Sequence, residues 1–176
     1  MSGNPDNASL WAEADVYIAP LGTQPPADVD TAFAAAWLLV GLLDGDDGFV
    51  ESREEDKEDK FGWGGILIRT PRKNFKLTKK FSALEDNPTT RQLVWPGSPA
   101  GKIVIPRPQP ILIAFETREN GKIRRLITSR HAEVDVDGDI TDNETDLTKY
   151  ELLATIFPTA AGELFDEQKS EVVVGG

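Results

Sequence analysis

The sequence predicts a mainly β protein, a sandwich or a partly closed barrel with one short α-helix. Two observations indicate strands: residues 74–82 alternate between apolar and polar side chains, and two β-type segments flank Asn120-Gly121. The clearest helix start, an asparagine cap followed by proline, lies at Asn87-Pro88. A chain of 176 residues can bury one core without disulfides, and it contains no cysteine. We therefore expect one β domain over residues 1–158.

The first 48 residues contain one clear strand and one ambiguous segment. Residues 14–19 are typical of a short strand that ends at Pro20. Residues 31–43 are open to two interpretations, because the alanines in 32–36 favour a helical turn whereas 37–43 have the composition of a buried strand. We expect a turn of helix followed by a strand.

Residues 51–65 are predicted to form a long acidic loop that ends in a glycine-aromatic corner. Six carboxylates and three bases occupy residues 51–60, and no apolar residue gives them a face to bury. In the corner, three glycines allow backbone conformations that a side chain would forbid. Phe61 and Trp63 are expected to act as apolar anchors there.

A basic strand and the helix follow this loop. Residues 69–80 carry six bases and no acid. Within residues 74–82 one face is apolar and the other is polar, as in a half-buried strand: Phe75, Leu77 and Phe81 on the first, and Lys76, Thr78, Lys80 and Ser82 on the second. The helix is predicted over residues 88–95, where Pro96-Gly97 ends it.

A hairpin over residues 111–130 is the strongest local prediction. Asn120-Gly121 tolerates the positive φ angles of a two-residue type I′ turn. That turn pairs the following residues across the two strands: Glu119 with Lys122, Glu116 with Arg125, Phe115 with Leu126, and Ala114 with Ile127. Charge then faces charge and apolar faces apolar, so the predicted register is consistent.

The C-terminal third is predicted to contain two more strands and an arm. Residues 132–136 and 147–157 are typical of strands, the second being the last, and an acidic loop separates them. Residues 103–105 are a candidate edge strand in a proline-rich segment. Residues 159–176 are expected to be a flexible C-terminal arm, ordered on assembly, with Leu164, Phe165 and the valines at 172–174 as anchors.

Charge is segregated along the chain. The net charge is −11, which disfavours attraction to phosphate and hence stable nucleic-acid binding. Residues 1–48 hold eight acids and no base, residues 133–146 hold seven acids and no base, and residues 69–80 are purely basic. One interpretation is that these are ordinary solvated loops. The other is that they are complementary patches of a self-associating subunit.

No catalytic, metal or cofactor site is predicted. The only histidine, His131, has no accompanying nucleophile motif, and the glycines around Trp63 lack a phosphate-binding spacing. The acidic run 135–139 places glycine at its fourth position, which does not match a calcium-binding loop. The longest apolar run, residues 32–43, is too short for a membrane helix, and no secretory signal is expected at the N-terminus.

The order of these parts resembles the major tail, or tail tube, proteins of long-tailed bacteriophages. The resemblance covers about residues 16–95: an apolar approach ending in Trp37, an acidic turn, an acidic strand, the Trp63-Gly64-Gly65 corner, a basic strand and a short helix. It implies a virion protein, made in the host cytoplasm, that forms hexameric rings. The inner sheets of the rings would join into a continuous barrel through which DNA passes. The implied partners are the chain itself and the tape measure, tail terminator and distal tail or baseplate proteins.

By this resemblance the long loop would reach a neighbouring subunit or ring, and we expect carboxylates to dominate the lumen. The residues expected to take part in assembly lie in the acidic run, the corner and the basic strand: Glu51, Glu54, Glu55, Asp56, Trp63, Gly64, Gly65, Lys76 and Lys80. The alternative class is a β-sandwich module that binds a ligand such as a carbohydrate. A dependence of molecular mass on protein concentration would separate the two.

Overall fold

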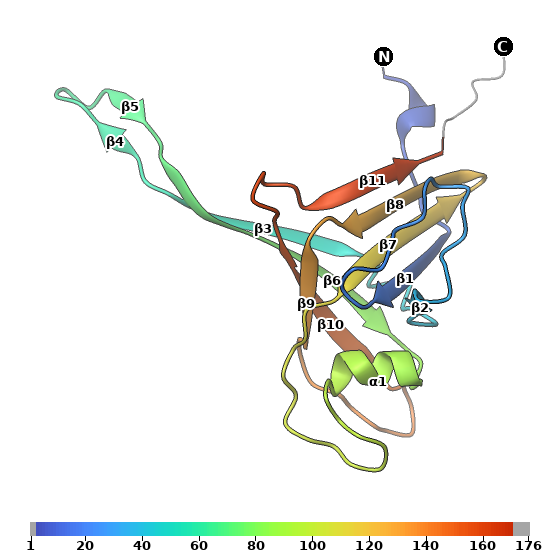
Figure 1. The fold of residues 1–176 in the computed structure, drawn as a ribbon. Helices are drawn as coiled ribbons and strands as arrows, with labels where there is room; N and C mark the ends of the chain where they lie inside the picture. The colour runs from blue at the N-terminus through green and yellow to red at the C-terminus, as the bar shows by residue number, and fades with distance from the viewer. Residues whose placement is uncertain (1–2, 171–176) are drawn as a thin grey trace.

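The computed structural model describes residues 3–170, which form two facing antiparallel sheets, a short helix and a long arm (Figure 1). The prediction of a mainly β sandwich with one α-helix is confirmed, and within the described residues no barrel closes. The elements in chain order are η1 (Pro5–Asn7), β1 (Glu13–Ala19), β2 (Leu38–Leu39), β3 (Val50–Lys57), β4 (Lys60–Phe61), β5 (Leu67–Arg69), β6 (Arg72–Ala83), α1 (Pro88–Val94), β7 (Leu112–Glu119), β8 (Lys122–Thr128), β9 (His131–Val136), β10 (Tyr150–Phe157) and β11 (Phe165–Lys169).

The five-stranded sheet has the order β11-β8-β7-β1-β2. Its centre is the predicted β7–β8 hairpin, and all four predicted cross-strand pairs are present in the predicted register. Asn120 and Gly121 have φ angles of 45° and 81°, as the predicted turn requires. The strand predicted at 14–19 is β1, which pairs with β7 along its whole length.

The four-stranded sheet has the order β3-β6-β10-β9. The basic strand predicted over residues 74–82 is β6, which is longer at its N-terminal end. The strands predicted at 132–136 and 147–157 are β9 and β10. Since β6 and β10 are central, the buried half of β6 forms the middle of this sheet.

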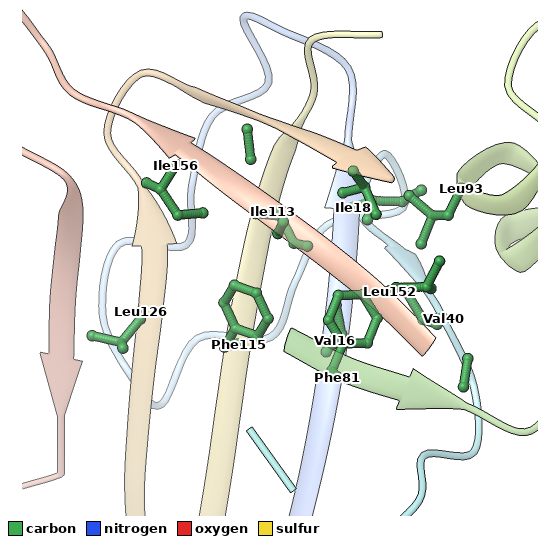
Figure 2. Packing of buried hydrophobic residues seen from close by; sticks show 14 of the residues in the cluster. Val16, Ile18, Val40, Phe81, Leu93, Ile113, Phe115, Leu126, Leu152 and Ile156 are labelled. Atoms are coloured by element: carbon green, nitrogen blue, oxygen red, sulfur yellow. The ribbon is translucent and has the colours of Figure 1, made fainter. Parts of the chain in front are cut away.

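The main core lies between the two sheets (Figure 2). The five-stranded sheet contributes Val16, Ile113 and Phe115, and the four-stranded sheet contributes Phe81 and Leu152; all are at most 2% exposed. The Phe115 ring makes edge-to-face contacts with the rings of Phe49, Phe81 and Phe165, at centroid distances of 5.2, 5.8 and 6.3 Å. Such contacts add to the free energy gained from burying the rings.

The other face of the five-stranded sheet is covered by residues 20–37. Phe33 stacks on Tyr17 at 4.1 Å and also contacts Trp37, whose indole N–H donates to the Gln24 carbonyl at 3.0 Å. These rings close a second, smaller apolar cluster. The predicted helical turn at 32–36 is wrong, and only Leu38–Leu39 of the predicted strand at 37–43 is a strand. Burial of the two aromatic side chains outweighs the weak helix propensity of the alanines.

A buried ionic cluster holds this covering segment. Glu116 and Arg125, 5% and 8% exposed, form an ion pair, and Arg125 Nη1 donates to the Asp28 and Thr31 carbonyls at 2.9 and 2.7 Å. Arg118 pairs with Glu116 and with Asp15 at 2.7 Å. Desolvation opposes the charge on Arg118, but the hydrogen bonds that it donates to Asp15 and Glu116 raise its pKa overall. The sequence predicted the pairing of Glu116 with Arg125 but not its burial.

The helix predicted at 88–95 is confirmed as α1. The Asn87 side chain accepts the Thr90 N–H at 2.8 Å, which caps the helix, and it also donates to the Val40 carbonyl at 2.8 Å. Leu93 and Val94 pack into the main core. The cap therefore fixes the helix to the segment that precedes β3.

Three further predicted elements are wrong. Residues 103–105 form no strand. The segment 51–65 is not a loop, since β3 and β4 occupy residues 50–57 and 60–61. The arm predicted from residue 159 contains β11, which pairs with β8 and places Phe165 against the core. The valines at 172–174 lie outside the described residues.

Replacing Arg125 by methionine is expected to lower the free energy of unfolding by about 3 kcal/mol, because the Glu116 carboxylate and two loop carbonyls lose a buried partner. Arg53→Met is the control, since that exposed ion pair with Glu51 contributes at most about 1 kcal/mol. Urea denaturation of the two variants measures the difference. Equal midpoints would show that the covering segment does not depend on the cluster.

Candidate assembly surfaces

A two-stranded arm projects from the edge of the four-stranded sheet. β3 pairs with β6 from Val50 and Lys80 out to Lys57 and Arg72, but β6 is buried only from Leu77 onwards. Past β3 the chain continues into β4 and β5, and the Gly62 N–H donates to the Ile66 carbonyl at 2.8 Å near the tip. Figure 1 shows this arm extending far to the left of the sandwich.

The acidic side chains of β3 have polar or basic neighbours, one within β3 itself and the others on β6. The predicted assembly residues of the acidic run have these partners: Glu51 with Arg53 at 2.8 Å, Glu54 opposite Lys76 in register, Glu55 with Arg72 at 3.4 Å, and Asp56 with the Asn74 amide at 2.7 Å. Opposite charges across an antiparallel pair stabilise it, so a sequence with no apolar face can still form a strand. This is why the predicted loop is a strand.

The glycine-aromatic corner forms the distal end of the arm. Gly64 and Gly65 have φ angles of 79° and 74°, which confirms that the corner needs positive φ. Trp63 is fully exposed and Phe61 is 61% exposed, so the expectation that they anchor the core is wrong. Ile66, Leu67 and Ile68 are also more than half exposed. The tip is therefore an uncovered apolar surface within the described chain.

The four-stranded sheet has a second face, here called the outward face, that points away from the core. Cross-strand partners share a face, so the register of the sheet identifies its residues. They are Val50, Ser52, Glu54, Lys76, Thr78, Lys80, Ser82, His131, Glu133, Asp135, Glu151, Leu153, Thr155 and Phe157. Four of these are acids and two are lysines, so the outward face is acidic in sum.

The two lysines predicted for assembly lie on this outward face, and each has an acidic neighbour in the same subunit. Lys80 Nζ lies 3.2 Å from Asp137 and 3.9 Å from Glu151. Lys76 is opposite Glu54. The sequence left open which subunit supplies these acids.

One end of the outward face is closed by the turn at residues 44–48. Asp47 accepts hydrogen bonds from Ser82 Oγ at 2.6 Å and from Lys149 Nζ at 2.9 Å. The Ser82 and Lys149 hydrogen bonds lower the pKa of Asp47, and the Asp47 hydrogen bond raises the pKa of Lys149. The turn is therefore bonded to β6 and to the residue that directly precedes β10.

An open cleft of about 820 Å³ lies where the two sheets diverge. Its walls include Trp11, Leu42, Phe49 and Leu126, and Lys79 contributes to its lining. Lys79 is only 7% exposed, and its ammonium lies 5.1 Å from the Phe115 ring and 5.8 Å from the Phe49 ring. Desolvation lowers its pKa. Lys79 was not predicted from the sequence as a notable residue, although the alternation that turns Leu77 and Phe81 inwards also turns Lys79 inwards.

The fold and these surfaces define a structural β-sandwich subunit with an exposed arm. A family model described as Phage tail tube protein matches residues 1–166, and the chain belongs to this family. It is thus a structural protein of the bacteriophage virion that self-assembles into the tail. No curated protein matches the chain.

The described residues contain no group of three or more histidine and carboxylate side chains arranged to hold a metal ion. Asp137 of the acidic run 135–139 instead pairs with Lys80. Among the same residues no helix has the length and hydropathy needed to cross a membrane.

Stability is expected to fall at acidic pH partly through Asp47. Its folded pKa is lowered, so its contribution is present above the unfolded value of about 3.9 and is lost as pH falls through the lower folded value. Thermal unfolding of the wild type and of Asp47→Asn should therefore differ at neutral pH and converge in the acid range. A difference that stays constant from neutral pH to pH of about 2 would contradict this.

Proposed function

We propose that six copies of the chain form a closed ring and that rings stack into the tail tube of a long-tailed phage. The tube is the conduit through which DNA leaves the virion. The shape and charge of the four-stranded sheet support this proposal most directly, because the sheet has two unlike open edges and an acidic outward face. By family resemblance, the tape measure protein fills the tube, and the terminator and distal tail proteins cap it.

The two edges of the sheet favour ring closure by strand pairing. β3 is one edge, an eight-residue exposed strand that pairs only with β6 among the described strands. β9 is the other, bridged to Ile111 only at Ala132. Strands alternate in direction across the sheet, so in a rotationally symmetric ring β9 meets the next subunit's β3 antiparallel and the ladder continues. Four strands from each of six subunits would make one barrel.

The charge of the outward face favours its position in the lumen. Glu54, Glu133, Asp135 and Glu151 outnumber Lys76 and Lys80 on this face. A wall rich in bases would bind phosphates through counterion release, whereas an acidic wall repels the passing DNA. The ion pair of Lys80 with Asp137, and the position of Glu54 opposite Lys76, further reduce the sites to which DNA could bind.

The arm is proposed to connect one ring to the next. It extends beyond the body of the subunit, and its apolar tip has no partner within the described chain (Figure 1). Apolar surface of this kind on a rigid projection is typical of a protein interface. Trp63, Gly64 and Gly65 thus belong to the ring-to-ring contact, whereas Glu51, Glu54, Glu55 and Asp56 stabilise the arm that carries them.

Shortening the arm is expected to abolish stacking without unfolding the subunit. Lys57 and Arg72 are directly paired, so an Asn-Gly turn can replace residues 58–71 between them. The variant should keep its free energy of unfolding within about 1 kcal/mol, because the arm buries little apolar surface. Electron microscopy should show rings but no tubes, while the control Lys60→Ala forms tubes. Tubes of normal length from the shortened variant would exclude the arm as the stacking element.

A further inference from the structure

A groove without acidic residues lies beside α1. It consists of two adjoining hollows of about 420 and 460 Å³ that share Pro96, Gly97 and Gln109, and it is here called the α1 groove. Its lining is mainly apolar and includes Arg91 and Arg107 but no carboxylate. Residues 87–115 as a whole hold three bases and no acid, in a chain whose net charge is −11. The α1 groove is thus both apolar and basic.

Hydrogen bonds to α1 hold the far wall of this groove in place. Arg91 Nη2, on the helix, donates to the Lys102 carbonyl at 2.8 Å and to the Pro99 carbonyl at 3.2 Å. Ile105, which lines the groove, is 80% exposed. An exposed apolar surface of this kind is typical of a protein interface. Because the groove is already formed, a partner that fills it loses little free energy to ordering the loop.

The loop between β9 and β10 presents a surface of opposite charge around one apolar side chain. Leu147 in this loop is 76% exposed. Asn143 Oδ1 accepts the Asp146 N–H at 2.7 Å, and Thr148 Oγ donates to Asp142 Oδ1 at 2.7 Å, so the turn is internally bonded. Residues 139–147 contain no base and four acids, none of which forms an ion pair within the described chain: Asp139, Asp142, Glu144 and Asp146.

The α1 groove and this acidic turn lie at the same end of the subunit, towards different edges of the four-stranded sheet. In Figure 1 both lie below the sandwich, at the end where α1 is drawn. Ile111 of the groove bridges to Ala132 of β9, which places the groove on the β9 side. The acidic turn leads into Lys149, whose Nζ binds Asp47 at 2.9 Å in the turn that precedes β3. Ring closure through β9 and β3 would therefore bring the two surfaces of neighbouring copies towards each other.

We propose that the acidic turn at residues 139–147 of one subunit docks in the α1 groove of the next subunit of the same ring. Leu147 enters the apolar hollows, and Glu144 and Asp146 lie against Lys102 and Arg107. Complementary charge fixes the orientation of such a contact and rejects other dockings. This inference rests on the proposed ring closure and adds a second contact to it. Within one subunit no hydrogen bond or ion pair among the described residues joins the two surfaces.

Cysteine cross-linking tests the docking, because the chain has no cysteine of its own. Leu147→Cys is combined with Ile105→Cys in the groove, both at exposed positions. Oxidation of assembled protein should give a ladder of oligomers that ends at the number of subunits in one ring, since the last link closes the circle. As controls, neither single-cysteine variant alone should cross-link, and the two variants assembled together should give dimers and nothing longer.

The outcomes separate the docking from the proposed function. Rings that form without the ladder, or with a disulfide inside one chain, would overturn the docking and leave the ring proposal intact. A ladder longer than one ring would place the contact between rings and would overturn the docking as well. A wild-type chain that forms no rings under any condition would overturn both.

Charge reversal tests the complementarity by a separate route. Lys102→Glu combined with Arg107→Glu should raise the protein concentration needed for ring formation by about tenfold, because like charges then face each other across the contact. Adding Glu144→Lys and Asp146→Lys to the same chain should restore ring formation. All four side chains are exposed, so the urea midpoint of the unassembled subunit should stay unchanged.

A matched control separates local charge from net charge. Lys122→Glu combined with Lys169→Glu changes the net charge by the same amount on β8 and β11, away from the α1 groove, and should leave ring formation unchanged. An equal effect of this pair, or no recovery when both sides of the contact are reversed, would overturn the charge pairing.

Discussion

The structure depends on one strand, β6, which is buried in the core along one half and exposed in the arm along the other. β6 runs through the centre of the four-stranded sheet from Leu77 to Ala83, where its side chains enter the core, and continues from Arg72 to Lys76 into the arm. Because both stretches belong to one continuous strand, the direction of the arm is fixed by the packing of Phe81 between the sheets. A rigid projection can therefore arise without any core of its own.

Interactions between opposite charges stabilise the acidic strand β3 and the segment that covers the five-stranded sheet. β3 has no apolar face, and cross-strand pairing with the bases of β6 stabilises it. Across the two strands Glu55 pairs with Arg72, and Glu54 and Asp56 lie opposite Lys76 and Lys73 in register. In the buried cluster, Glu116 and Arg125 fix the segment that covers the five-stranded sheet. Charge pairs thus position both the arm and the covering segment.

Sequence reasoning predicted the elements whose signals are local. The Asn120-Gly121 turn fixed a hairpin with its register, and the Asn87 cap fixed the helix. It failed where pairing is long-range: β3 is a strand only because β6 returns beside it, and β11 only because β8 accepts it. Trp63 was assigned to a core because composition does not reveal exposure. The sequence suggested the arm residues as candidates for assembly, a prediction that remains to be tested, and it did not indicate the cleft that Lys79 lines.

The central claim is that the four-stranded sheets of neighbouring subunits join edge to edge with their outward faces towards the lumen. A cryo-electron microscopy reconstruction of the assembled protein tests it most directly. The account predicts hydrogen bonds between β9 of one subunit and the next subunit's β3, and Glu54, Glu133 and Asp135 on the inner wall. An inner wall formed by the five-stranded sheet, or one with more unpaired lysine and arginine than carboxylate, would contradict it.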